Sequence, residues 1–450
     1  MQFSWHSSSF GCRVRAATSR RRRNSLTMSS AAAPSSLSDR SRTTALRRLV
    51  TANALSSVGD GARFAALPML AMWSTGDVFW VSVVAAAGRA AWLLAPVIGT
   101  LVDRMPRRRS MVGADLARSV MMLPLVALLV RGPVPVAVLV LVTFASGVAE
   151  VFFDSAAQAV VPALAPDHEL ERTNARVIAA QITGTGFVGP PLGAVLWAVW
   201  HPLPFLLDGA TFAASALLLM NLPERTGHTG PGAGERGVRH LLRDTWAGLR
   251  FLGRDRVLRR LMMVVAVLGV GQQAVYSILV VYAEQRLGLP SYGYSLMLVT
   301  AAVGSLAGAR TAARTARWLG PGRSLWAPVA VSALSYLVVA VLPWWPLVAA
   351  MLALNSAAVV LWNVCTVSLR QRLAPPDMLG RVTSGYRLAA WGAMPIGASA
   401  GGALAQQAGL DTPWVLAGLL LLACLPLLRG VASAGSGAEE ADSGSSGNAG

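Results

Sequence analysis

The sequence predicts an all-α protein that crosses a membrane twelve times. Its 450 residues are 54% hydrophobic and 13% charged, with a mean hydropathy of +0.52, which is too apolar for an ordinary soluble domain. A helix of about 20 apolar residues spans the hydrocarbon core of a bilayer. Windows of that length recur along the chain, with short polar loops between them.

The apolar windows form two sets of six. The first set covers 47–73, 79–102, 110–130, 134–160, 172–198 and 204–222, and the second covers 259–284, 292–315, 324–342, 345–370, 379–407 and 413–429. We therefore expect two pseudo-symmetric six-helix bundles at 44–222 and 259–430, joined by a polar linker at 223–258. The ends at 1–43 and 431–450 are rich in small and polar residues, which predicts unstructured tails.

The distribution of arginine predicts the orientation. The chain has no lysine, and its arginines gather in alternate loops, with little beyond Arg131 and Arg286 on the other side. Cytoplasmic loops retain positive charge, so we expect a multi-pass protein of the cell membrane with both termini in the cytoplasm. Because the net charge of +18 is spread over several loops and a tail, it does not indicate nucleic-acid binding.

Two further features concern the ends and the linker. The arginine-rich start has no apolar signal-peptide region, and we expect translation to begin at Met28. Within the linker, residues 238–252 place leucines and Trp246 on one helical stripe and charged residues elsewhere. This pattern predicts an amphipathic helix at the cytoplasmic membrane surface.

The loop between the second and third predicted helices, GTLVDRMPRRR at 99–109, carries the sharpest motif. It resembles the signature loop of the major facilitator superfamily, which implies the major facilitator fold and alternating access around a central cavity. Such a loop can form contacts that hold the cytoplasmic side closed in one conformation and break in the other. We expect this conformational latch to comprise Gly99, Asp103, Arg104, Arg107 and Arg108, with Asp115 and Arg118 extending it.

The fifth predicted helix contains Gly189, Pro190 and Gly193, within the sequence GTGFVGPPLGA. Proline removes a backbone hydrogen bond, and glycines permit close packing. The segment partly resembles the Gly-Pro motif of facilitator antiporters, which implies a hinge in an exporter. A generic kinked packing helix is the alternative.

Shorter stretches resemble the drug- and siderophore-exporter branch of the superfamily, including macrolide exporters. They are 53–60 (NALSSVGD), 207–212 (LDGATF) and 247–252 (AGLRFL). The arginine that marks the fourth helix of many drug:proton antiporters is absent, and this helix offers Glu150 and Asp154 instead.

Five ionisable residues fall at membrane depth: Asp60, Arg63, Arg89, Glu150 and Asp154. Each costs at least about 2.5–3.5 kcal/mol at a helix centre, so such residues are usually functional. Burial favours the neutral form of a carboxyl group, whereas a nearby arginine favours the ionised form. We expect Glu150 or Asp60 to carry a proton, with Arg63 or Arg89 as counter-ion. A structural ion pair is the alternative.

The second half offers candidates for a substrate cavity, which combines apolar walls with a few polar anchors. They are Gln272, Gln273, Tyr276, Asn355, Trp362, Asn363, Arg387 and Trp391. Hydrogen bonding between helices explains each Asn and Gln equally well. The sequence has no ATP-binding loop, no HExxH motif and no catalytic His/Cys or Ser/His/Asp set, so we expect neither an enzyme nor an ATP-driven pump, and no cofactor or metal.

Together these observations predict a monomeric secondary transporter that exports a small amphipathic or hydrophobic compound, driven by protons. Drug resistance is the expected phenotype. Two alternatives remain: uptake or lipid movement by the same fold, and a membrane receptor or scaffold that transports nothing.

Overall fold

The computed structural model describes residues 39–164, 170–222, 238–375 and 378–429, and the regular secondary structure of these residues is helical. The helices belong to the compact unit Ala45–Gly450, except for the first residues of α2. The predicted tails lie mostly outside the described residues, although α2 already begins at Asp39.

The first set of predicted spans corresponds to ten helical segments. These are α2 (Asp39–Thr75), α3 (Val78–Ala90), the 3-10 turn η1 (Ala91–Leu94), α4 (Ala95–Asp103), α5 (Arg107–Leu129), α6 (Val136–Leu164), α7 (Leu170–Ile182), the π-helical η3 (Thr183–Val188), α8 (Gly189–Val199) and α9 (Leu203–Met220). The segments outnumber the six spans because two of the spans are interrupted.

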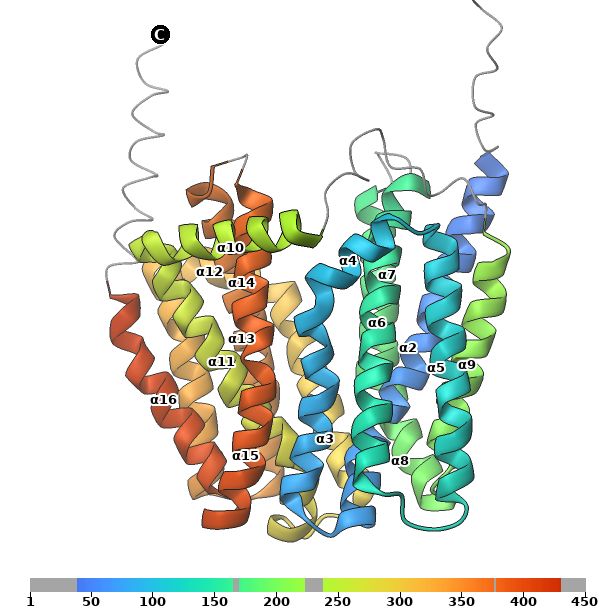
Figure 1. Ribbon diagram of the computed structural model, residues 1–450. Helices are drawn as coiled ribbons and strands as arrows, with labels where there is room; N and C mark the ends of the chain where they lie inside the picture. Colours follow the sequence, from blue (N-terminus) through green and yellow to red (C-terminus); the bar gives the residue numbers. More distant parts are fainter. Residues whose placement is uncertain (1–38, 165–169, 223–237, 376–377, 430–450) are drawn as a thin grey trace, which may run out of the picture. The chain divides into compact units, whose positions relative to one another are not determined.

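The linker helix and the second set of spans follow in the same order along the chain. They are α10 (Val238–Arg254), α11 (Arg256–Val281), the π-helical η4 (Tyr282–Arg286), α12 (Ser291–Val341), α13 (Trp345–Leu373), α14 (Leu379–Gly392), α15 (Met394–Ala408) and α16 (Thr412–Leu428). The helices of each half run side by side in Figure 1.

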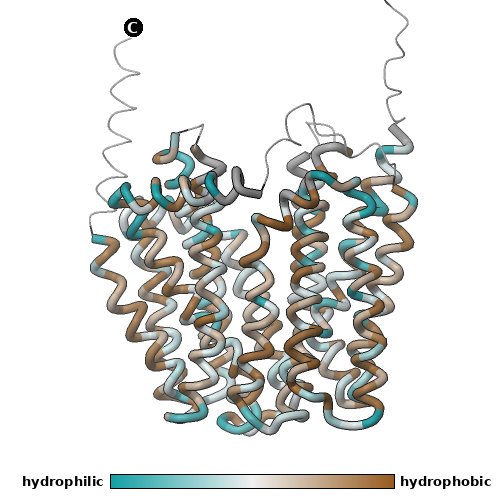
Figure 2. The backbone as a smooth tube through the Cα atoms, in the orientation of Figure 1, coloured by the Kyte–Doolittle hydropathy of each residue, from teal (hydrophilic) through white to brown (hydrophobic). Residues whose placement is uncertain are grey.

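Ten stretches within the described residues are long and apolar enough to cross a membrane. Two predicted spans fall outside that set: α16 is shorter, and α2 carries several charged residues along its 37 residues. With these two, the predicted twelve membrane helices in two sets of six are confirmed. Figure 2 shows apolar residues along the middle of the helices and more polar residues near their ends.

Proline and glycine interrupt four of the predicted spans or their connections. Proline lacks the N–H that an α-helix needs, and Pro96 follows the 3-10 turn η1, while Pro190 follows the π segment η3. The break between α14 and α15 at Ala393 likewise precedes a proline. In α12, Gly320 joins two spans with a φ of 76°, a value that favours glycine.

The two halves contact each other mainly through α3, which packs against α15 and α11. Ser82 of α3 donates to Ser277 of α11 with an Oγ–Oγ distance of 3.3 Å, and Gln406 of α15 donates to Asp77 at 3.0 Å. Both contacts lie toward the start of α3, away from the 99–109 loop. On the opposite side of the helices, α10 lies across their ends and contacts α4, α11 and α14 (Figure 1).

The predicted amphipathic helix in the linker is therefore present as α10. Its Leu252 is fully buried and Leu249 packs on the core, whereas Trp246 is 69% exposed. The side chains of Leu241 and Leu242 lie outside the described residues.

Candidate functional site

A cavity of about 490 Å³ lies among the helices, and most of its lining comes from the first half of the chain. Residues of α2, α3, α5, α6 and α7 contribute, together with η1 and η3. From the second half, Gln273, Tyr276, Ser277 and Tyr294 complete the wall. The cavity combines apolar surface with polar and charged groups, as small-molecule sites do.

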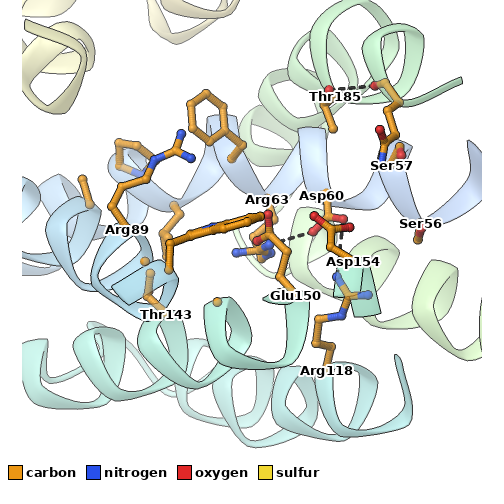
Figure 3. Close-up of a pocket in the computed structure, with 18 of the residues that line it drawn as sticks. Ser56, Ser57, Asp60, Arg63, Arg89, Arg118, Thr143, Glu150, Asp154 and Thr185 are labelled. Atoms are coloured by element: carbon orange, nitrogen blue, oxygen red, sulfur yellow. Dashed lines mark hydrogen bonds and ion pairs between the residues drawn. The ribbon is translucent and has the colours of Figure 1, made fainter. Parts of the chain in front are cut away.

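Six charged residues line this cavity: Asp60, Arg63, Arg89, Arg118, Glu150 and Asp154. Helix geometry gathers them, because residues three or four apart share a face. Asp60 and Arg63 are one turn apart on α2, and Glu150 and Asp154 are one turn apart on α6. Figure 3 shows both pairs meeting in one region of the cavity.

Arg63 is held by two carboxylates. Its Nη2 donates to Oδ1 of Asp60 at 2.7 Å, and its Nε lies 2.9 Å from Oδ2 of Asp208 on α9. The side chain of Asp208 is fully buried behind the cavity wall. Asp208 therefore holds Arg63 from behind the cavity wall. Removing either residue would leave the charge of the other buried and uncompensated.

Arg118 of α5 is held in a similar way. Its guanidinium lies 3.6 Å from Oδ2 of Asp60 and also binds Asp115, whose carboxylate accepts a hydrogen bond of 2.6 Å from Ser215. The ring of Phe212 lies 4.0 Å from the guanidinium carbon, which adds a cation–π contact. Asp60 therefore bridges two arginines that each have a second acidic partner.

Glu150, Asp154 and Arg89 differ from these paired groups. Among the described residues, none of the three has a hydrogen bond or an ion pair through its side chain. In and behind the cavity wall there are therefore five carboxyl groups, those of Asp60, Asp115, Glu150, Asp154 and Asp208, and three guanidinium groups, those of Arg63, Arg89 and Arg118. The excess of acidic groups faces the cavity from α6.

The residues expected to form the conformational latch separate into two places. Arg108 donates to the backbone oxygens of Met220 and Leu222 at 3.2 and 3.1 Å, which joins the 99–109 loop to the end of α9. Arg104 is exposed, Arg107 is half-buried, and the side chain of Asp103 lies outside the described residues.

The structure shows two further features of the predicted latch residues, and the second differs from the sequence-based expectation. No atom of the described residues lies within 4 Å of where a Cβ of Gly99 would be, so no helix approaches closely there in this conformation. Asp115 and Arg118 are buried, and Arg118 lines the cavity and contacts Asp60 instead of the loop. The rotation of α5 about its axis decides which neighbours these two side chains contact, and the sequence alone does not give this rotation.

The expected hinge residues Gly189, Pro190 and Gly193 pack tightly against α2. A Cβ at Gly189 would lie 2.5 Å from the Cα of Gly61, and one at Gly193 would lie 2.7 Å from the Cα of Ala62. The π segment η3 directly precedes these residues. Both the packing and the interruption inferred from the sequence are therefore present, and hinge motion stays a prediction.

Of the cavity candidates in the second half, Gln273 and Tyr276 line this cavity, and the other six are not among its lining residues. The buried Asn355 donates to the hydroxyl of Tyr336 at 3.3 Å, which fits the interhelical hydrogen bonding considered above. The other five are Gln272, half-buried; Trp362, buried; Asn363 and Arg387, exposed; and Trp391, whose ring lies 4.6 Å from that of Trp92.

Sequence reasoning missed two residues that matter to the site. The first is Asp208, which belongs to the LDGATF stretch; that stretch has a family resemblance, but no role is predicted for Asp208 from it. The second is Thr143, a buried residue of α6 that lines the cavity. The intramembrane position of Asp208 was the available signal. Thr143 has no such signal, because threonine is common in apolar helices.

Comparison with known proteins agrees with this architecture. A model described as Major Facilitator Superfamily matches residues 49–394. The chain is 29% identical over 378 residues to the "Multidrug efflux pump Tap" of Mycolicibacterium fortuitum, covering 81% of this chain and 90% of that one. It is 31% identical over 137 residues to "Macrolide efflux protein A" of Enterococcus faecalis, covering 29% of this chain and 42% of the relative.

Solved structures share the fold at lower identity. A bacterial homologue of the iron transporter ferroportin, in its inward-facing state, superposes with a TM-score of 0.70 at 18% identity, covering 86% of this chain and 98% of the other. The nucleoside transporter NupG gives a TM-score of 0.66 at 12% identity, covering 86% and 98%.

Proposed function

Because this chain belongs to the Major Facilitator Superfamily, and so is a multi-pass membrane transporter rather than an enzyme, we propose that it exports a small amphipathic compound in exchange for protons. One observation carries this proposal: Glu150 and Asp154 lie on the cavity wall and form no ion pair with another described residue, whereas Asp60 is already paired. The efflux function of the relatives supports the outward direction of transport.

The orientation follows from charge. Arginines gather in the 99–109 loop and in the linker, and such loops stay in the cytoplasm. We therefore propose that both termini are cytoplasmic and that the protein acts as a monomer in the cell membrane. The contacts Ser82–Ser277 and Asp77–Gln406 then close the outer side.

Proton coupling requires a carboxyl group whose charge state changes with access. Asp60 is a weak candidate, because its carboxylate already pairs with Arg63 at 2.7 Å and with Arg118 at 3.6 Å. Glu150 and Asp154 have no such partner among the described residues, so either carboxylate can bind a proton without breaking an ion pair. We assign proton binding to these two residues: they take up a proton from the outside and release it when a cationic group of the substrate enters from the cytoplasm.

The experiment uses proteoliposomes that contain the purified chain and a pH-sensitive dye. Adding a transported substrate on one side should release protons into that compartment, and an opposing proton gradient should drive substrate uphill. Glu150→Gln and Asp154→Asn should each abolish uphill transport, because a neutral amide does not titrate.

The matched control is Asp411→Asn, since Asp411 forms an exposed ion pair with Arg286 and lies far along the chain from the cavity helices. This variant should transport normally. Uphill transport that survives in Glu150→Gln/Asp154→Asn would refute the assignment of the proton site. Substrate movement without any response to a proton gradient would refute proton coupling altogether.

A further inference from the structure

Arg89 is a cationic group of the cavity that the proposed proton exchange does not use. It lines the cavity from α3, and no described residue forms an ion pair, a hydrogen bond or a ring contact with its guanidinium. Arg63 and Arg118, the other two arginines of the cavity, are both held by carboxylates. Arg89 is half-buried on the cavity wall, so its guanidinium is available to bind an anionic group of a ligand.

Thr143 is a second donor without a partner at the same end of the cavity. Its residue is 5% exposed, and its buried hydroxyl has no hydrogen-bond partner among the described residues. A Cβ placed at Gly88 would lie 3.1 Å from Cγ2 of Thr143, so Thr143 packs directly against the residue that precedes Arg89. A hydroxyl and a guanidinium that line the same end of one cavity suit an anionic oxygen, such as that of a carboxylate.

The unpaired acidic groups lie on the same helix as Thr143, toward the other end. Glu150 is seven residues beyond Thr143 and Asp154 is eleven residues beyond it, which places them about 10 and 16 Å farther along α6. Figure 3 shows Arg89 and Thr143 on one side of the cavity and Asp154 on the other, with Glu150 between them. The cavity is therefore dipolar, with an end that attracts anions and an end that attracts cations.

We infer that the substrate class is zwitterionic: a compound with a carboxylate, or an equivalent anionic oxygen, separated by about 10 Å from a cationic nitrogen. The carboxylate binds Arg89 and Thr143, and the cation binds Glu150 and Asp154. The apolar and aromatic side chains of Phe64 and Trp92 on the cavity wall contact the body of the molecule. This inference rests on the proposed export function and adds which compounds it selects.

The site should select against a compound that leaves one of its charged side chains without a counter-charge. A purely cationic compound of the same shape compensates Glu150 and Asp154 but leaves Arg89 without a counter-charge. A hydrogen bond to a charged group contributes enough to change affinity by about tenfold or more. The zwitterion should therefore be preferred over its ester by at least that factor.

The test compares two dyes that share one fluorophore, rhodamine 110, which has a free carboxylate, and its methyl ester, rhodamine 123. Efflux is measured from pump-deficient cells that express the full chain, with and without a protonophore. The expected result is protonophore-sensitive export, with an export rate at equal internal dye concentration about tenfold higher for rhodamine 110. Equal export rates, or a preference for the ester, would overturn the zwitterion inference while leaving proton-driven export intact.

Two variants locate the preference. Arg89→Gln should abolish the preference for rhodamine 110 over rhodamine 123, mainly by lowering rhodamine 110 export about tenfold, and Thr143→Val should reduce that preference by a smaller factor. The control is Arg131→Gln, which changes an exposed arginine in a loop outside the cavity. If Arg89→Gln reduces the export of both dyes equally, Arg89 is structural and the inference is wrong.

Direct binding provides the same comparison without a variant. Fluorescence polarisation of each dye with the purified wild-type protein should give about tenfold tighter binding for rhodamine 110. Equal affinities would overturn the inference even if Arg89→Gln does not fold. Absence of protonophore-sensitive export for both dyes, with both bound, would instead refute the proposed export function.

Discussion

Asp208 offers the sharpest test of the charged network, because it is fully buried and its carboxylate lies 2.9 Å from Nε of Arg63. In Asp208→Asn, the volume and shape of the side chain persist and the charge disappears. Breaking a buried ion pair costs about 3–5 kcal/mol. Arg63 keeps its 2.7 Å contact with Asp60, so we expect a loss near the lower value, about 3 kcal/mol.

The assay is thermal unfolding of the purified protein in detergent, followed by tryptophan fluorescence. With an unfolding entropy of about 2.1 cal/mol/K per residue, a chain of 450 residues should lose about 3 °C in Tm for that free energy. A double-mutant cycle with Arg63→Gln isolates the pair. The double variant should be little less stable than Arg63→Gln alone, because Asp208 has then lost the charge it compensates.

The matched control is again the exposed pair of Arg286 and Asp411, at 3.2 Å. Surface pairs contribute little to stability, so Asp411→Asn should leave Tm almost unchanged. If Asp208→Asn behaves like Asp411→Asn, or if the cycle gives no coupling between Arg63 and Asp208, the view that burial makes this pair structurally important is wrong.

Two further predictions concern packing and conformational change. Gly193→Val should lower Tm and the amount of folded protein in the membrane, because its Cβ would lie 2.7 Å from the Cα of Ala62, and Gly113→Val, which meets no atom within 4 Å, should be tolerated. In a background without cysteines, Ser82→Cys/Ser277→Cys should form a disulfide under mild oxidation, since the two Oγ atoms are 3.3 Å apart. Transport should then stop and recover on reduction, and transport that continues in the fully cross-linked protein would show that these helices need not separate.

The fold was predictable because hydrophobicity and length alone identify membrane helices. All twelve windows correspond to helices or to runs of two or three helical segments, and two of the windows lie in α12. The apolar windows do not predict where a membrane helix is interrupted. Pro190 indicated the break before α8, but the 3-10 turn at 91–94 depends on how Pro96 is accommodated against neighbouring helices.

The candidate site was predictable mainly in its first half; of the eight candidates in the second half, only Gln273 and Tyr276 line the cavity. Asp60, Arg63, Arg89, Glu150 and Asp154 stand out because charge at membrane depth is costly, and all of them line the cavity. Polar residues of the second half carry no comparable signal, since an amide serves packing or binding equally well. Which partner each charge takes, such as Asp208 for Arg63, depends on helix rotation, which the sequence does not encode locally.

The interruptions of two neighbouring spans have a mechanical consequence. The 3-10 turn η1 and the break at Ala393 lie beside each other, because Leu93 lies against Gly392 and the rings of Trp92 and Trp391 are 4.6 Å apart. Each half-helix on the side where α10 lies (α4 or α14) is therefore a short rigid arm that can bend at the interruption. For α4, nine residues give an arm of about 13 Å, so a bend of about 20° moves its far end by about 5 Å.

Such a bend leaves α3 and α15, on the other side of the interruptions, packed against each other. Because α10 contacts both α4 and α14, it can couple the movements of these two half-helices. The amphipathic linker helix then transmits motion between the halves and does more than connect them.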